Sequence, residues 1–107
     1  MLAKKFRLPV GTFPRGVKPS GKNRYMAVVK IKNNLNHDRL GVVFRAKAFR
    51  GAALRNKLKR FVFDNAPIEK KTQKGRAQDI LVILNPEILK LTKKELKDNL
   101  DKYVGAN

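Results

Sequence analysis

The chain contains no cysteine, no tryptophan, a single histidine and only 8 acidic residues among its 107 residues. Without cysteine, neither a disulfide nor a thiolate metal site can form. The longest unbroken apolar run, residues 80–84, is far shorter than the roughly 20 residues that a membrane-spanning helix needs. Residues 1–5 lack the apolar segment of a signal peptide. We therefore expect a cytoplasmic protein with no membrane partner.

Positive charge is what the chain has in excess: 26 lysines and arginines give a formal net charge of +18. Residues 1–60 hold 17 of these cations and one acid, whereas residues 61–107 hold 9 cations and 7 acids. This asymmetry favours a nucleic acid or an anionic membrane as partner. Because no segment is typical of a membrane anchor, RNA or DNA is the default interpretation.

The most informative segment is Arg55-Asn56-Lys57-Leu58-Lys59-Arg60, in which four of the residues are cationic. Its flanking residues predict a helix over about residues 52–65, which Pro67 limits at its end. At roughly 100° per residue, an apolar stripe occupies one side of this helix and the charges occupy the other. The stripe consists of Leu54, Leu58, Phe61, Val62 and Asn65. The like charges repel unless an anion neutralises them, although a simply solvated face is the alternative.

The rest of the chain predicts three strands and a second helix. The strands lie near residues 25–32, 40–44 and 80–84, and their Val/Ile/Leu content indicates central, well-covered positions. Residues 67–78 are polar and basic, so we expect an exposed loop there. Thr92 and Glu95 have the spacing of a capping box that opens the second helix.

The element order of strand, strand, helix, strand and helix predicts the α+β class. We expect a small two-layer α/β sandwich with the helices packed on one side of a mixed sheet. At this length, residues 1–107 form a single domain. Three prolines and three glycines interrupt residues 1–24, so we expect an irregular N-terminal arm there, with the sheet and helices in residues 25–104.

The basic segment and its surroundings resemble the protein component of bacterial ribonuclease P. Arg55-Asn56-Lys57-x-Lys59-Arg60 is similar to the Arg-Asn-Arg-x-Lys-Arg motif of that family. Further matching positions follow in the same order along nearly the whole chain: Leu8, Phe13, Arg24-Tyr25, Arg39-Leu40-Gly41, Lys47, Ala52 and Asp79. The resemblance implies an α/β sandwich with a left-handed βαβ crossover, a handedness found in only about 2% of such connections.

The same resemblance implies a noncatalytic protein subunit whose partner RNA removes the 5′ leader from precursor tRNA. Magnesium ions, bound mainly by the catalytic RNA, are the implied cofactor. The residues assigned to the surface that binds ribonuclease P RNA are Arg45, Lys47, Arg50, Arg55, Asn56, Lys57, Lys59 and Arg60. Those assigned to the cleft for the single-stranded leader are Phe13, Val17, Tyr25 and Ala27.

Side-chain alternation puts Tyr25 and Ala27 on one face of their strand, with Met26 and Val28 turned toward the helices. The opposite assignment of the two faces is also open. Phe63 falls within the basic face of the first helix. It either stacks on an exposed base or packs under the N-terminal arm or the loop after Pro67.

The chain departs from the family's pattern at several positions. Lys57 replaces the second arginine of the motif and loses its planar fork, and Phe63-Asp64 stands where an Arg-Glu pair is usual. Val17 occupies the second aromatic position of the N-terminal segment.

Catalysis by the protein itself is not expected. Metal-dependent hydrolysis needs clustered carboxylates or histidines, and His37 is expected in an exposed turn. A ribosomal-type structural RNA-binding protein is the alternative function. A factor that binds DNA nonspecifically ranks below it, because no helix-turn-helix or zinc-ligand spacing is present.

Overall fold

The computed structural model describes residues 3–9, 16–45 and 49–105 of the chain. The elements, in chain order, are η1 (Lys4–Phe6), β1 (Gly21–Lys22), β2 (Met26–Lys32), β3 (Arg39–Phe44), α1 (Ala52–Asn65), β4 (Gln78–Leu84), η3 (Pro86–Lys90) and α2 (Lys93–Tyr103). The predicted strand, strand, helix, strand, helix order is confirmed, with β1 and the short 3₁₀ turns added to it.

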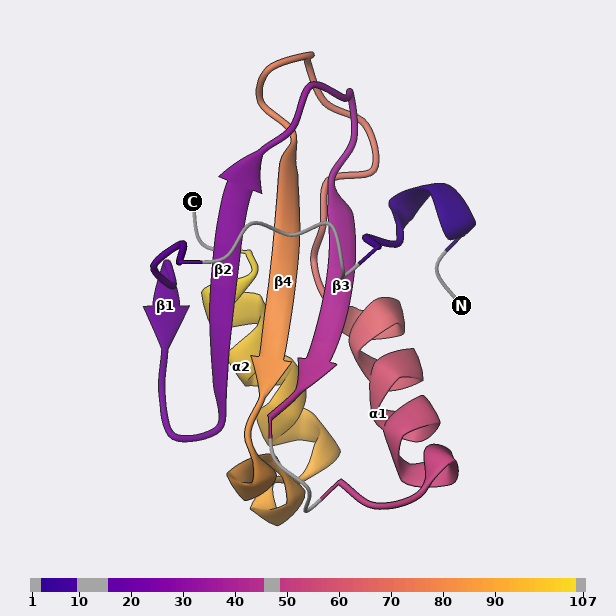
Figure 1. The fold of residues 1–107 in the computed structure, drawn as a ribbon, viewed down its shortest axis with the longest axis vertical. Coiled ribbons are helices and arrows are strands. Elements are labelled where there is room, and N and C mark those ends of the chain that lie inside the picture. The colour runs from indigo at the N-terminus through magenta and orange to yellow at the C-terminus, as the bar shows by residue number, and fades with distance from the viewer. Residues whose placement is uncertain (1–2, 10–15, 46–48, 106–107) are drawn as a thin grey trace.

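The strands form a mixed four-stranded sheet in the order β1-β2-β4-β3 (Figure 1). β2 is antiparallel to β4 over its full length, from Met26 opposite Leu84 to Lys32 opposite Gln78. β3 is parallel to β4, with Arg39 opposite Asp79 and Phe44 opposite Leu84. The two longest strands, β2 and β4, therefore pair at the centre of the sheet. The parallel neighbours β3 and β4 are connected along the chain through α1.

The prediction that all three strands are central is wrong for β3, which lies at an edge of the sheet. Its apolar content has another cause. Part of its open edge is covered by the N-terminal segment, where Arg7 bridges Leu40 and the Leu8 N–H donates to the Leu40 carbonyl at 2.9 Å. The covered edge lets a strand rich in apolar residues occupy this position.

Both helices cover the same face of the sheet. One core cluster joins Met26, Val28 and Val82 of the sheet with Val62 of α1 and Leu100 of α2, and each of these side chains is fully buried. In Figure 1, β3 and β4 run downward with β4 to the left of β3, and α1 returns behind the sheet. The β3-α1-β4 connection is therefore left-handed, against the strong general preference for right-handed crossovers.

The N-terminal region contains a strand that the sequence did not predict. β1 pairs antiparallel with β2, with Gly21 opposite Val28 and Lys22 opposite Ala27. Gly21 lies against the ring of Tyr103, where an added Cβ would approach the ring Cδ1 atom at 2.5 Å. The absence of a side chain thus allows β1 to lie close to α2.

Candidate nucleic-acid interface

The exposed side of α1 is a row of polar and cationic side chains, here called the basic ridge, which consists of Asn56, Lys57, Lys59 and Arg60. All four residues are exposed. On the opposite side of the helix, Val62 is fully buried and Leu58 is half-buried against the core. The predicted amphipathic helix is confirmed with the same bounds, Ala52–Asn65.

The ridge carries unneutralised charge. Among the described residues, the ion pairs are Arg39–Asp79, Lys90–Glu87 and Lys97–Asp101, and none includes a ridge residue. α1 also has no acidic residue in its first turn. A surface with this much uncompensated positive charge favours an anionic partner that releases counterions on binding.

Arg55 has a structural contact as well as an exposed position at the start of α1. Its Nε donates a hydrogen bond to the carbonyl of Phe49, which is buried, at 2.9 Å. Gly51, just before the helix, has a φ of 85°, a conformation that favours glycine. Arg55 therefore ties the turn before α1 to the helix that carries the ridge.

The remaining residues assigned to RNA binding lie on the connection between β3 and α1. Arg45 and Arg50 are exposed at its two ends, and the Arg45 N–H donates to the Leu84 carbonyl at 2.9 Å. Lys47 lies outside the described residues. Arg45 and Arg50 therefore flank the connection that leads from β3 into α1.

A hollow of about 460 Å³, here called the arm hollow, lies between the ridge, β3 and the N-terminal segment. It is lined by Arg7, Leu8, Gly41, Val42, Asn56, Lys59, Arg60 and Phe63. Phe63 is half-buried and packs on the core. Of the two interpretations of Phe63, packing beside the N-terminal segment agrees with this position, while base stacking stays untested.

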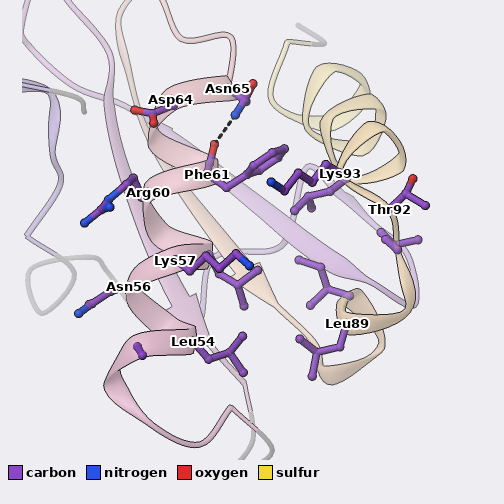
Figure 2. A pocket seen from close by; sticks show the side chains of 15 residues that line it. Leu54, Asn56, Lys57, Arg60, Phe61, Asp64, Asn65, Leu89, Thr92 and Lys93 are labelled. Carbon is purple, nitrogen blue, oxygen red and sulfur yellow. Dashed lines mark hydrogen bonds between the residues drawn. The ribbon is translucent and has the colours of Figure 1, made fainter.

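A second hollow, here called the helix groove, lies on the other side of α1, between α1 and the η3–α2 segment (Figure 2). Its volume is about 590 Å³. Sequence analysis missed its contributors Leu89 and Lys93, because no local pattern relates them to α1. The only signal in the sequence was the pair of adjacent apolar residues Ile88-Leu89. The structure buries Ile88 and leaves Leu89 exposed.

The residues predicted for a leader cleft are only partly described. Phe13 lies outside the described residues, whereas Val17 and Tyr25 are half-buried. Ala27 is buried, yet it is absent from the core cluster that includes Met26 and Val28. Strand alternation therefore puts Tyr25 and Ala27 on the sheet face away from the helices.

The acids nearest the basic half of the chain hold the fold together. Asp38 accepts hydrogen bonds from the backbone N–H groups of Gln78 at 2.8 Å and Glu69 at 2.9 Å. Asp79 accepts from Nε and Nη2 of Arg39 at 2.8 and 2.7 Å. The bonds of Asp38 thus hold the loop between α1 and β4 near Glu69 and at its end, while the bonds of Asp79 join the start of β4 to β3.

The environment of Asp79 shifts its pKa. Burial raises the pKa of the carboxyl, but hydrogen bonds from Arg39 and Asn33 and the charge of Arg39 outweigh this effect, so its pKa lies below the ordinary value of 3.8. Asp79 is therefore an ionised structural group.

His37 is not the exposed turn residue that we expected. It is half-buried, and its ring meets Phe6 edge-on, with ring centroids 5.0 Å apart. Within the described ranges, no group of three or more His, Cys, Asp or Glu residues is arranged to hold a metal ion. No helix in the same ranges is both long and apolar enough to span a membrane.

Comparisons with known proteins agree with this arrangement. The ribonuclease P family model matches residues 15–106. No significant match was found among curated protein sequences. The fold is similar to that of the Staphylococcus aureus RNase P protein, with a TM-score of 0.62, 26% identity, and coverage of 79% of this chain and 76% of that chain.

Two structures of the Thermotoga maritima RNase P protein are also similar. One has a TM-score of 0.62 and 27% identity, and the match covers 87% of this chain and 86% of that one. The other, in complex with 1-(4-fluorophenyl)-2-thiourea, has a TM-score of 0.63, 28% identity, and coverage of 87% and 88%. Together with the family match over most of its length, these similarities show that the chain belongs to the ribonuclease P protein family, whose members are RNA-binding subunits of the tRNA-processing ribonucleoprotein.

Proposed function

We propose that this subunit assists a catalytic RNA in removing the 5′ leader from precursor tRNA by binding both the RNA and the leader. The observation that carries the proposal is the basic ridge on α1, whose sequence resembles the family motif apart from Lys57 and whose cations have no acidic partner among the described residues. In this proposal, catalysis resides in the RNA, and the complex works in the cytoplasm.

Binding of the catalytic RNA is assigned to the ridge, together with Arg45, Lys47, Arg50 and Arg55. Cationic side chains neutralise phosphates and release counterions. Lys57 provides charge without the two-pronged geometry of arginine, so its contact with phosphate is less directional. Magnesium is bound mainly by the RNA, and the protein lowers the magnesium concentration that the RNA needs.

Binding of the leader is assigned to the sheet face opposite the helices, with Phe13, Val17, Tyr25 and Ala27 as its candidate residues. Support comes from Tyr25, a half-buried aromatic residue on that face. Aromatic and apolar side chains can stack on unpaired bases without reading their sequence. The two RNA-binding surfaces then lie on different sides of the molecule, which lets the protein contact the catalytic RNA and the leader together.

The experiment that tests this proposal is precursor-tRNA cleavage by a bacterial ribonuclease P RNA at low magnesium, with and without the protein, over a series of leader lengths. Stimulation that grows with leader length supports both surfaces. Stimulation that is independent of leader length removes the leader surface and keeps the RNA surface. If several bacterial RNAs are bound but none is stimulated, the proposed assistance is wrong.

A further inference from the structure

The helix groove is an open, largely apolar channel that the proposed function does not use. Leu54, Leu58 and Phe61 of α1 form one wall, and Ile88, Leu89, Leu91 and Leu96 form the other. Figure 2 shows Leu54 and Phe61 on the α1 wall and Leu89 on the opposite wall. Its volume of about 590 Å³ lies within the roughly 300–1,000 Å³ typical of ligand pockets.

Leu89 makes this groove unlike an ordinary packing seam. It is 48% exposed, and the only other large apolar side chain that the described residues expose to a similar extent is Leu35, at 36%. Leu35 lies in the turn between β2 and β3, where it lines neither hollow. Covering such an exposed apolar side chain with a flat apolar surface is favourable, because apolar area is removed from water.

The rim of the groove is cationic on both sides. Lys57 extends from α1, and Lys93 extends from the start of α2, with both amino groups directed over the channel in Figure 2. Neither lysine has an acidic partner among the described residues. Asp64 is the one carboxylate among the lining residues, and it lies at the end of the channel near the C-terminus of α1.

The groove is continuous with the basic ridge. Asn56, Lys57 and Arg60 belong to the ridge and also line the groove. A strand whose phosphates contact the ridge therefore has an apolar channel directly beside it. Phosphate-binding cations next to an apolar surface form the combination that binds unpaired nucleotides, with the backbone held by charge and the base held by contact with its flat face.

We propose that the helix groove receives an unpaired base of the catalytic RNA, which rests on Leu89 and Phe61 while Lys57 and Lys93 hold the adjoining phosphates. This inference rests on the proposed function, because it assumes that RNA lies on the ridge. The catalytic RNA is the source rather than the leader, since the groove lies on the helix side of the sheet and Tyr25 and Ala27 lie on the other face.

Site-directed crosslinking tests the location. Because the chain has no cysteine, Leu89→Cys creates a single attachment point for a photoactivated crosslinker. Leu35→Cys is the matched control at the other strongly exposed leucine. We expect the Leu89→Cys conjugate to label one or a few unpaired nucleotides of ribonuclease P RNA, and the Leu35→Cys conjugate not to label them. No labelling from Leu89→Cys, or the same labelling from both positions, would overturn the proposal.

Binding measurements separate base contact from charge. Leu89→Ser should weaken affinity for ribonuclease P RNA by about three- to tenfold without changing the salt dependence, because it removes apolar contact and no charge. Lys93→Gln should lower the slope of log affinity against log salt by about one unit. The matched controls are Leu35→Ser and Lys94→Gln, since Lys94 is exposed on the same helix but does not line the groove.

The outcomes distinguish this inference from the proposed function. If the wild-type protein binds ribonuclease P RNA and stimulates cleavage, but Leu89→Ser and Lys93→Gln behave as their controls do, only the base site is wrong. If Leu89→Ser weakens only the leader-dependent part of precursor binding, the choice of the catalytic RNA is wrong. If the wild-type protein does not bind the RNA, the proposed function fails first.

Discussion

At the scale of single residues, carboxylates and cations have separate tasks. Asp38 and Asp79 are buried and hydrogen-bonded. Asp38 fastens the loop between α1 and β4 through Glu69 and Gln78, and Asp79 ties the start of β4 to Arg39 of β3 and to Asn33. The cations of the ridge are exposed and have no acidic partner among the described residues. The negative charges thus stabilise the fold, while the positive charges remain available for an anionic partner.

Asp79→Asn should lower the free energy of unfolding at neutral pH by about 1–3 kcal/mol, because it removes the charge that pairs with Arg39. The folded-state pKa of Asp79 lies below its ordinary value of 3.8, so its contribution is complete above that pH and is lost as pH falls through the folded pKa. Urea unfolding measured from neutral pH to below pH 3.8 should therefore show a smaller acid loss in the variant than in the wild type.

Asp98→Asn is the control for this comparison, because Asp98 is an exposed carboxylate on α2. An equal acid loss in the wild type and Asp79→Asn would show that the ion pair with Arg39 does not contribute to the pH dependence.

Arg60→Ala should weaken binding of ribonuclease P RNA and lower the log–log salt slope by about one unit, because one phosphate contact is lost. Filter binding at several salt concentrations measures both quantities. Lys102→Ala serves as the control, since it removes an exposed cation at the far end of α2. An unchanged slope for Arg60→Ala would remove Arg60 from the RNA interface.

At the scale of elements, local signals account for where the helices begin. Thr92 accepts a hydrogen bond from the Glu95 N–H at 3.2 Å, and the Glu95 carboxylate accepts one from the Thr92 N–H at 3.0 Å. The predicted capping box is therefore confirmed. α1 begins differently, after Gly51 and without a side-chain cap, and Arg55 ties its first turn to the preceding segment.

Thr92→Ala should destabilise the protein by about 1 kcal/mol, because the first turn of α2 loses its side-chain acceptor. Thr92→Ser keeps the hydroxyl and should restore most of the loss. Thermal unfolding of the three proteins measures the effect. Equal stability of the alanine and serine variants would mean that the cap does not stabilise α2.

Gly21→Ala should destabilise the protein by about 1–3 kcal/mol, since the new methyl group would meet the ring of Tyr103 and force β1 or α2 to shift. In a Tyr103→Ala background, the same change should have little effect. A double-mutant cycle of unfolding free energies tests this coupling, and additive effects would contradict it.

At the scale of the whole molecule, a net charge of +18 on 107 residues opposes the compact state through self-repulsion. The radius of gyration is 13.1 Å, so most charges lie within a few Debye lengths of one another at moderate salt. The free protein therefore folds against a repulsion that bound RNA would relieve.

We expect the midpoint of thermal unfolding to rise by a few degrees as sodium chloride increases from about 10 to 150 mM, because salt screens this repulsion. The double variant Lys57→Gln and Lys59→Gln has less charge on the ridge and should respond more weakly. A midpoint that falls with salt in this range would show that attractive ion pairs outweigh the repulsion.

Several elements could be predicted from the sequence because their signals are local. The spacing of Leu54, Leu58 and Val62 predicts α1 with its observed bounds, and the apolar runs predict β2, β3 and β4 to within two residues. β1 could not be predicted, because two residues, one of them Gly21, carry no periodic pattern and form a strand only by pairing with β2.

The candidate site divides in the same way. The cationic residues of α1 and their common face follow from helical periodicity, so the sequence by itself determines the basic ridge. Tertiary packing alone decides the edge position of β3, the left-handed path of α1 and the groove between α1 and Leu89. The physical reason is that periodicity records which side of its own helix or strand a residue occupies, whereas the contacts between distant elements depend on how the complete core packs.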